Sequence, residues 1–496
     1  MRRSLTIVLL CCSMFSMAVV PPRDPSRQAE WQAHIDAQRE VWMQIQQSGR
    51  MQAPAVQKAV GTRVTIPRIL VIMANFTDYK ILSTKAEVDS MFNGLNWTKD
   101  GATGSVRQYF HDQSMGAYNP QFDIVGPVEL SKGYADYGKP KTAVNMVKEA
   151  CQLADDQVDY SPYDSDNDGK VDLVFVLCAG FGENDPPTED IIPVSSDLIW
   201  PQYTHTSAGP FDGKYIYACE YSNELNGLGS TVVNKLVGGI GVVCHEFGHA
   251  LGLPDMYVTK GSSTHKLLGS WDIMCYGPYN NDMHTPPSFT AYERFFMGWL
   301  TPTLITEPDT LYLEPLDTSN KAYLISENDT HNLDGLHPDT AVFYLLENRQ
   351  LQGWDSYIPG SGLLLTRINY DANVWAGNIV NNDPDNLGVD LIEADGLTPG
   401  TNTYYGYYGK AGDAFPAGAT SYNGIPDHDI TDITVTDGTI AFVYRGGIPA
   451  DTDSVKTQVV IPALERPMIY KTVRDGQLFI HSGGHTYSIY GIKQDD

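Results

Sequence analysis

The segment HEFGHALGLPD, His245–Asp255, decides how the rest of the chain is interpreted. Its H-E-x-x-H pattern places His245 and His249 four residues apart, so on a helix both imidazoles share a face and can bind one metal ion. Glu246 lies beside them, where it can take a proton from an attacking water molecule. At ordinary residue usage, a chain of this length contains the pattern by chance only about 0.01 times. The segment therefore predicts a catalytic metal helix.

The third ligand is expected just beyond this helix. Gly252 follows where the helix has to end, since glycine adopts the left-handed conformation of a C-terminal cap without steric penalty. That turn can bring Asp255 back to the metal, and two imidazoles with one carboxylate form a catalytic zinc set that leaves a position open. Asp255 as a simple turn residue is the alternative interpretation. Other candidates for the third ligand are Glu293, His265 and His284.

A methionine turn is predicted downstream, in GSWDIMCYG at 269–277. H-E-x-x-H-x-x-G followed by such a turn is the metzincin arrangement, in which the methionine packs beneath the metal site and is not a ligand. Met274 takes that position. Tyr276 is close enough in sequence to donate a hydrogen bond to the tetrahedral intermediate. A buried loop in which both side chains merely pack is the alternative.

A second dense motif, DSDNDGKVD at 164–172, resembles the front of an EF-hand loop. The twelfth position is Phe175, so the usual bidentate glutamate is missing, and a strand-like run follows in place of a helix. We interpret the motif as a calcium-binding turn, and a turn that holds no ion is the alternative. The candidate calcium ligands are Asp164, Asp166, Asp168, the backbone carbonyl of Lys170, and Asp172.

Strand-like and helix-like segments alternate from residue 61 to residue 302, which predicts an α/β catalytic domain. From 303 to 446, short apolar runs are separated by Gly, Pro, Asn and Asp, which predicts a β-rich domain. The expected fold class is therefore an α/β (α+β) metzincin-like catalytic domain followed by a β-rich domain. Residues 447–496 form a β-rich C-terminal tail that loosely resembles the short sorting signals with which some Gram-negative bacteria attach proteins to their surface.

The N-terminus has the pattern of an export signal. Arg2 and Arg3 precede the apolar run LTIVLLCCSMFSMAVV, and small residues at Ser16 and Ala18 suit a signal peptidase. Residues 1–18 are predicted to be a signal peptide and 19–60 a candidate pro-segment, with an N-terminal helix packed on the body as the alternative. Asp24 could cover the metal in a latent form. No later segment is long and apolar enough to cross a bilayer.

The composition is that of a folded protein, with 42% hydrophobic and 19% charged residues. The formal net charge of −27 argues against nucleic-acid binding, which needs a basic face. Removing the signal leaves an odd number of widely spaced cysteines, so a disulfide scaffold is not expected. These are Cys151, Cys178, Cys219, Cys244 and Cys275. The oligomeric state is not predicted.

HEFGHALGLPDMY, WDIMCYGPYNN and TPPSFTAYERFFMGWL resemble the immune inhibitor A-type secreted metallopeptidases, a metzincin-like family. The resemblance extends from about Pro67 to Tyr444. It implies an exported zinc endopeptidase made with a pro-segment, and the family carries a comparable acidic loop. His245, Glu246 and His249 match its zinc-helix motif, and Asp255 matches its aspartate.

The leading hypothesis is a secreted or cell-surface zinc endopeptidase that cleaves proteins or peptides, with Zn²⁺ in the active site and Ca²⁺ in the acidic loop. Glu246 would be its general base. The alternative is a surface adhesion or glycan-binding protein with a vestigial metallopeptidase domain, which the β-rich region and the acidic loop motivate. The intact His245, Glu246 and His249 favour the enzyme.

Overall fold

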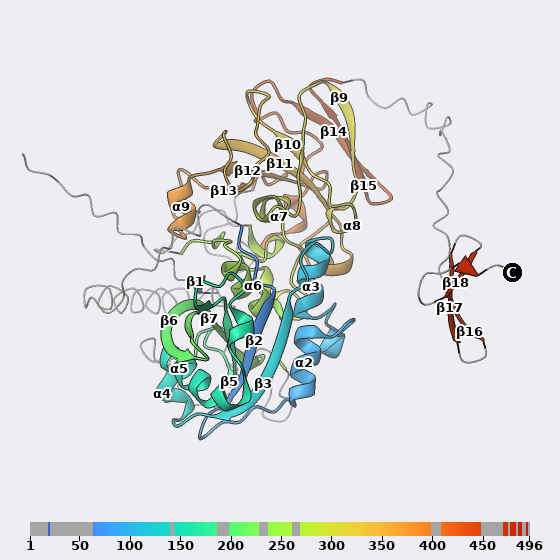
Figure 1. Cartoon of the computed structure of the whole chain (residues 1–496). Helices are drawn as coiled ribbons and strands as arrows, with labels where there is room; N and C mark the ends of the chain where they lie inside the picture. Colours follow the sequence, from blue (N-terminus) through green and yellow to red (C-terminus); the bar gives the residue numbers. More distant parts are fainter. Residues whose placement is uncertain are drawn as a thin grey trace, which may run out of the picture. The chain divides into compact units, whose positions relative to one another are not determined.

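The computed structural model describes residues 63–138, 143–185, 198–227, 237–259, 268–397 and 408–447, together with short strands at 18–19 and between 470 and 494 (Figure 1). The chain divides into two compact units, Met1–Gly447 and Ile448–Asp496. The predicted signal peptide and pro-segment lie outside the described residues except for Ala18 and Val19, as do Asp24 and His265.

A mixed seven-stranded sheet forms the centre of the first unit, in the order β1-β6-β7-β5-β2-β3 with β4 beside β7. β2 pairs in parallel with β3 and β5, and β5 pairs in parallel with β7, whereas β6 is antiparallel to both β7 and β1. The strands are β1 (Ala18–Val19), β2 (Arg68–Asn75), β3 (Gln121–Glu129), β4 (Lys170–Val171), β5 (Val174–Phe181), β6 (Gln202–Phe211) and β7 (Lys214–Leu225).

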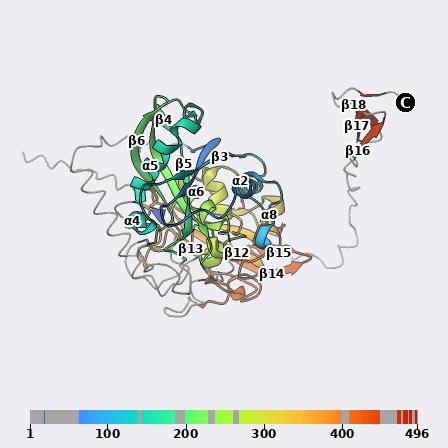
Figure 2. The same ribbon diagram turned by 90° about the horizontal axis from the view of Figure 1, so that it is seen from below.

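Helices cover both faces of this sheet (Figures 1 and 2). Successive side chains of a strand point to opposite faces, so Ile69 and Val71 of β2 join one apolar core while Leu70 and Ile72 join another. The first core includes α2 (Lys85–Asn93), α3 (Val106–Gln113) and α6 (Gly241–Ala250), and the second includes α4 (Tyr134–Gly138) and α5 (Ala143–Ala154). The predicted mixed α/β fold is confirmed.

Helix α6 lies inside the first core, with all of its residues buried. The ring of Phe247 packs against Phe110 of α3, with the ring centroids 4.8 Å apart. The helix is followed by Gly252 at a φ of 105°, whose N–H donates to the carbonyl of His249 at 2.9 Å. This left-handed turn redirects the chain at the position expected from the sequence.

Two further sheets follow residue 302. The five-stranded sheet has the order β13-β12-β11-β10-β8, and the three-stranded sheet has the order β14-β15-β9. Their strands are β8 (Thr303–Leu304), β9 (Asp309–Leu313), β10 (Tyr323–Ile325), β11 (Val342–Arg349), β12 (Gly362–Asn369), β13 (Val389–Leu391), β14 (Ile430–Thr436) and β15 (Thr439–Tyr444). The helices of this half of the unit are α7 (Ala291–Met297), α8 (Leu316–Ser319) and α9 (Ala372–Ala376).

One face of the five-stranded sheet extends the core that surrounds α6. Phe343 and Leu345 of β11 belong to that core, while Tyr344 and Leu346 point the other way into a core shared with the three-stranded sheet. Residues on both sides of position 302 therefore pack together within one unit. The domain boundary at 302 stays a prediction.

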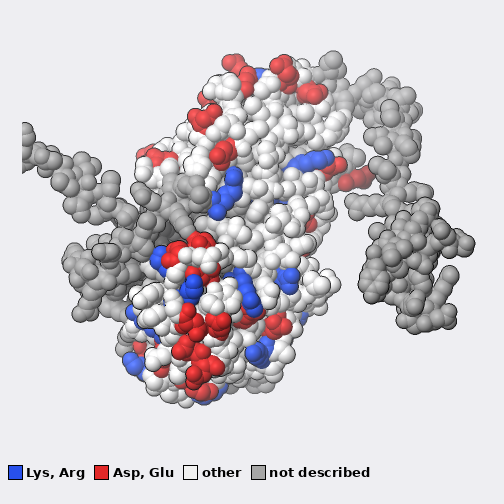
Figure 3. Space-filling model, in the orientation of Figure 1, with Lys and Arg blue, Asp and Glu red and all other residues white. Residues whose placement is uncertain are grey.

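The second unit is an antiparallel four-stranded sheet of β16 (Tyr470–Arg474), β17 (Gln477–Ser482), β18 (His485–Ser488) and β19 (Lys493–Gln494). Its role as a sorting signal stays a prediction. Within the described residues, no helix has the length and apolar character needed to span a membrane. On the face of the first unit seen in Figure 3, acidic side chains are spread from the β-rich half down to the seven-stranded sheet.

Candidate metal centre

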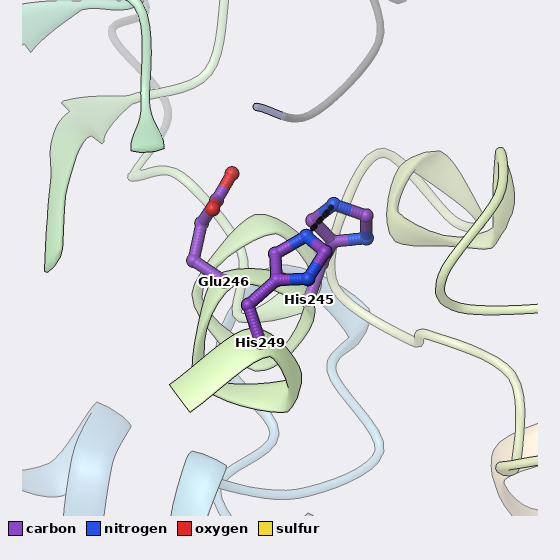
Figure 4. Close-up of side chains that lie close together, drawn as sticks. All are labelled: His245, Glu246 and His249. Carbon is purple, nitrogen blue, oxygen red and sulfur yellow. Dashed lines mark hydrogen bonds between the residues drawn. The ribbon is translucent and has the colours of Figure 1, made fainter. Parts of the chain in front are cut away.

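Helix α6 carries His245 and His249 on one face, as the four-residue spacing requires (Figure 4). Their Nε2 atoms lie 3.2 Å apart, and both residues are buried, with 0% and 7% of their surface exposed. The imidazole rings meet nearly at right angles, with an interplanar angle of 87°. Two imidazole nitrogens are thus directed at one point.

Asp255 returns to the same point after the turn at Gly252. Its Oδ1 atom lies 3.4 Å from Nε2 of His245 and 3.1 Å from Nε2 of His249. Burial raises the pKa of the Asp255 carboxyl, but the imidazoles of His249 and His245 outweigh burial and hold that pKa well below its usual range. The side chain is therefore a carboxylate at neutral pH, the form that binds a metal.

The other ring nitrogen of each histidine fixes the tautomer. Nδ1 of His245 lies 2.7 Å from the carbonyl oxygen of Ile273, and Nδ1 of His249 lies 2.8 Å from that of Leu253. A carbonyl oxygen can only accept, so each Nδ1 carries a proton, and in the neutral imidazole that binds a metal each Nε2 then has a free lone pair. Both histidines are thus in the form that can ligate a metal.

These three atoms fit a tetrahedral zinc ion. With metal–ligand distances of about 2.0–2.1 Å, tetrahedral geometry places neighbouring ligand atoms about 3.3 Å apart, and the three separations here are 3.1, 3.2 and 3.4 Å. Oδ1 of Asp255 is buried and has no hydrogen-bond partner. Three lone pairs that converge in a buried place repel one another unless a cation lies between them.

Glu246 extends from α6 beside the two imidazoles (Figure 4). It is fully buried, and its Oε2 accepts the backbone N–H of Tyr203 on β6 at 2.7 Å. A carboxylate oxygen of Glu246 and nitrogens of both histidines lie within 4.8 Å of one another. The backbone of Tyr203 on β6 thus anchors the Glu246 carboxylate beside the candidate metal site.

The methionine turn lies directly beneath α6. A β-carbon at Gly248 would be only 2.8 Å from Sδ of Met274. The missing side chain of this glycine therefore leaves room for the sulfur against the helix. The N–H of Met256 also donates to the carbonyl of Met274 at 2.8 Å. These contacts join the methionine turn to the segment that carries Asp255.

Two tyrosines accompany the site. Tyr276, predicted from the sequence, is buried and packs its ring against Tyr408 with a centroid distance of 5.6 Å. Tyr257, which sequence reasoning missed, stacks on His245 with the ring centroids 6.4 Å apart. Burial and then the nearby Asp255 raise the pKa of Tyr257 well above its usual value. The position of Tyr257, two residues after Asp255, is the sequence feature that could have indicated its place near the site.

The rival ligands serve other purposes. Glu293 closes the capping box of α7, where its Oε2 accepts the N–H of Thr290 at 2.7 Å and the Thr290 hydroxyl at 3.0 Å. His284 stacks on Trp97 at a centroid distance of 6.2 Å. Neither side chain belongs to the cluster of His245, His249 and Asp255.

The alternative ligands are distinguished by metal content. We expect Asp255→Ala to lose zinc on dialysis, because a converging oxygen is removed, whereas Glu293→Gln should retain stoichiometric zinc because glutamine can still cap α7. Zinc would be measured by atomic absorption in folded, gel-filtered protein. Loss of zinc from Glu293→Gln together with retention by Asp255→Ala would contradict the assignment.

The acidic loop brings three carboxylates within 4.8 Å of one another, those of Asp164, Asp166 and Asp172. Oδ2 of Asp164 forms an ion pair with Nζ of Lys214 at 2.7 Å, and Asp168 pairs with Lys170 at 2.8 Å. The Asp164 carboxylate also accepts the backbone N–H groups of Asp168 and Gly169. Lysine and the loop backbone thus already balance part of the negative charge, and calcium binding stays a prediction.

Residues 56–299 match the family model described as Immune inhibitor A peptidase M6, catalytic domain. The chain is 25% identical over 288 residues to Immune inhibitor A of Bacillus thuringiensis subsp. alesti, an alignment that covers 49% of this chain and 41% of that protein. It is also 25% identical over 251 residues to Pre-pro-metalloprotease PrtV of Vibrio cholerae serotype O1 (strain M66-2), covering 42% and 26%. The chain therefore matches less than half the length of each relative.

Proposed function

We propose that the chain is a zinc-dependent endopeptidase that hydrolyses peptide bonds of extracellular proteins, on the premise that residues 56–299 match the catalytic domain of the immune inhibitor A (M6) peptidases. The observation that carries the proposal is the triangle formed by Nε2 of His245, Nε2 of His249 and Oδ1 of Asp255, with sides of 3.1–3.4 Å. Its dimensions and its convergent lone pairs suit a single zinc ion.

In this proposal His245, His249 and Asp255 hold the zinc. The ion supplies Lewis acidity for the peptide carbonyl and a nucleophile at neutral pH. Glu246 takes the proton of the attacking water and delivers it to the leaving amine, and its bond to the Tyr203 N–H keeps the carboxylate oriented for both transfers. Tyr276 is proposed to donate a hydrogen bond to the developing oxyanion.

Export and latency belong to the same proposal. The signal pattern at 1–18 supports secretion or display at the cell surface, and a relative named as a pre-pro-metalloprotease supports a pro-segment at 19–60. Calcium in the loop at 164–172 remains proposed on its sequence pattern alone. The convergence of His245, His249 and Asp255 favours an active peptidase over an adhesin with a vestigial metal domain.

Metal removal tests the function. We expect treatment with 1,10-phenanthroline to abolish cleavage of casein by the full-length protein, because the remaining side chains cannot polarise the carbonyl, and we expect added zinc to restore it. Cleavage would be measured before and after limited trypsin treatment, which activates a latent form, and the trypsin would be removed completely before casein is added. A serine-protease inhibitor is the control and should have no effect. Casein cleavage that persists in zinc-free protein would contradict the proposal.

A further inference from the structure

Asp255 is held by a residue from the β-rich half of the unit. Asn378, which follows α9, donates from Nδ2 to Oδ2 of Asp255 at 2.5 Å and accepts the N–H of Asp255 on its Oδ1 at 2.6 Å. The two residues are 123 positions apart and are both buried, with 3% and 0% of their surface exposed. One side-chain amide thus binds both the backbone and the carboxylate of the third candidate ligand.

The direction of the amide follows from its partners. The backbone N–H of Asp255 can only donate, so it must face Oδ1 of Asn378, which turns Nδ2 toward the carboxylate. Oδ2 of Asp255 is thereby engaged, while Oδ1 is the atom that faces His245 and His249. The contact therefore selects which oxygen is presented to the metal.

Neighbouring asparagines hold the same segment by its backbone. Nδ2 of Asn381 donates to the carbonyl of Met256 at 2.8 Å, and the N–H of Thr259 donates to Oδ1 of Asn382 at 2.8 Å. Neither bond involves the carboxylate of Asp255. Within this asparagine-rich loop, Asn378 combines a backbone contact with a contact to the ligand side chain, whereas Asn382 offers a matched residue that only docks the loop.

We propose that Asn378 is the positioning residue of the third metal ligand, an inference that rests on the proposed function. Its amide orients the Asp255 carboxylate so that one oxygen points to the metal and the other stays hydrogen-bonded. Partners of this kind commonly contribute about 10–100-fold to metal affinity. The metal centre is accordingly completed by residues beyond the predicted domain boundary at 302.

Asn378→Asp is the most specific test, because it removes the amide donor while keeping the size of the side chain. Asn378 has a φ of 50°, and aspartate tolerates this left-handed conformation almost as well as asparagine, so the backbone should be retained. The new carboxylate can still accept the N–H of Asp255 but offers no amide donor to Oδ2, and its charge faces that of Asp255. Asn378→Ala removes both bonds, and Asn382→Ala is the matched control.

The experiment compares these full-length variants with wild type by competition for zinc against a chromophoric chelator, and by the visible absorption spectrum after cobalt substitution. We expect Asn378→Asp and Asn378→Ala to weaken zinc binding about 10–100-fold and to alter the cobalt spectrum. Asn382→Ala should keep the wild-type zinc affinity and spectrum even where it lowers the melting temperature.

Wild-type zinc affinity and an unchanged cobalt spectrum in Asn378→Asp would overturn the inference. Equal weakening by Asn382→Ala would also overturn it, because the effect would then come from loop docking in general. Failure of the wild type itself to bind zinc would contradict the proposed function and this inference with it. The wild-type and variant arms therefore separate the two failures.

Discussion

Glu246→Gln is expected to lower kcat for peptide cleavage roughly 10²–10⁴-fold while zinc content stays at the wild-type level. Glutamine has the shape of glutamate but cannot take up the proton of the attacking water. Its amide oxygen can still accept the Tyr203 N–H, so the side chain should keep its place beside β6. The loss should therefore appear in kcat, with little change in KM.

The measurement uses a fluorogenic peptide, with zinc determined on the same samples. Glu220→Gln is the matched control, because Glu220 is a buried glutamate on the neighbouring strand β7. Burial, followed by the charge of Glu246, raises the pKa of Glu220 well above its usual value, which favours the neutral form that glutamine mimics. An equal kcat for wild type and Glu246→Gln would refute Glu246 as general base.

The local part of the candidate site was predictable because it depends on short-range geometry. A four-residue spacing on a helix brings His245 and His249 to one face, and a glycine that accepts a φ of 105° lets the chain return. Asp255 then needs only a short turn to reach them. The placement of His245, His249 and Asp255 thus depends on the helical repeat and on one glycine, and both can be recognised in the sequence.

The supporting contacts were not predictable for a physical reason. Tyr203 contributes its backbone N–H, which every residue except proline possesses, so no residue type marks it. Asn378 lies in an asparagine-rich turn, where such residues are expected whatever they contact. Its bond to Asp255 depends on how two distant segments pack, and that information is absent from local patterns.

The same distinction holds for the fold. Buried β-branched runs such as β2 predicted strands, and their alternation with helices predicted a mixed α/β arrangement. The apolar alternation in β11 indicated that Phe343 and Leu345 face a core, but not that this core is the one around α6. Periodicity identifies a buried face without identifying its partner.

A buried arginine joins the two halves of the first unit. The Arg349 guanidinium on β11 binds Asp355 through Nε at 2.7 Å and Nη2 at 2.6 Å, and its Nη1 binds Glu347 at 3.0 Å. It also donates to the carbonyls of Trp271, within the methionine turn, and Ser288, ahead of α7. Burial lowers the pKa of Arg349, but the two carboxylates outweigh burial and raise it.

Arg349→Met is expected to lower the free energy of unfolding by about 3–5 kcal/mol, because two carboxylates would be left buried without their cation. Urea unfolding followed by tryptophan fluorescence measures the change. Lys321→Met is the control, since its ion pair with Glu314 is exposed and should contribute less than about 1 kcal/mol.

Adding Asp355→Leu to Arg349→Met should recover part of the loss, because it removes one of the uncompensated charges from the interior. No recovery would mean that the lost hydrogen bonds outweigh the unpaired charge, since the double variant lacks the Arg349 bonds to the Trp271 and Ser288 carbonyls and the 2.8 Å bond from the Ser288 N–H to Asp355. Equal destabilisation by Arg349→Met and Lys321→Met would contradict the role of the buried ion pair. Trp271 lies in the turn that carries Met274 and Tyr276, so a lowered zinc affinity that persists when stability is recovered would show that Arg349 also positions the methionine turn.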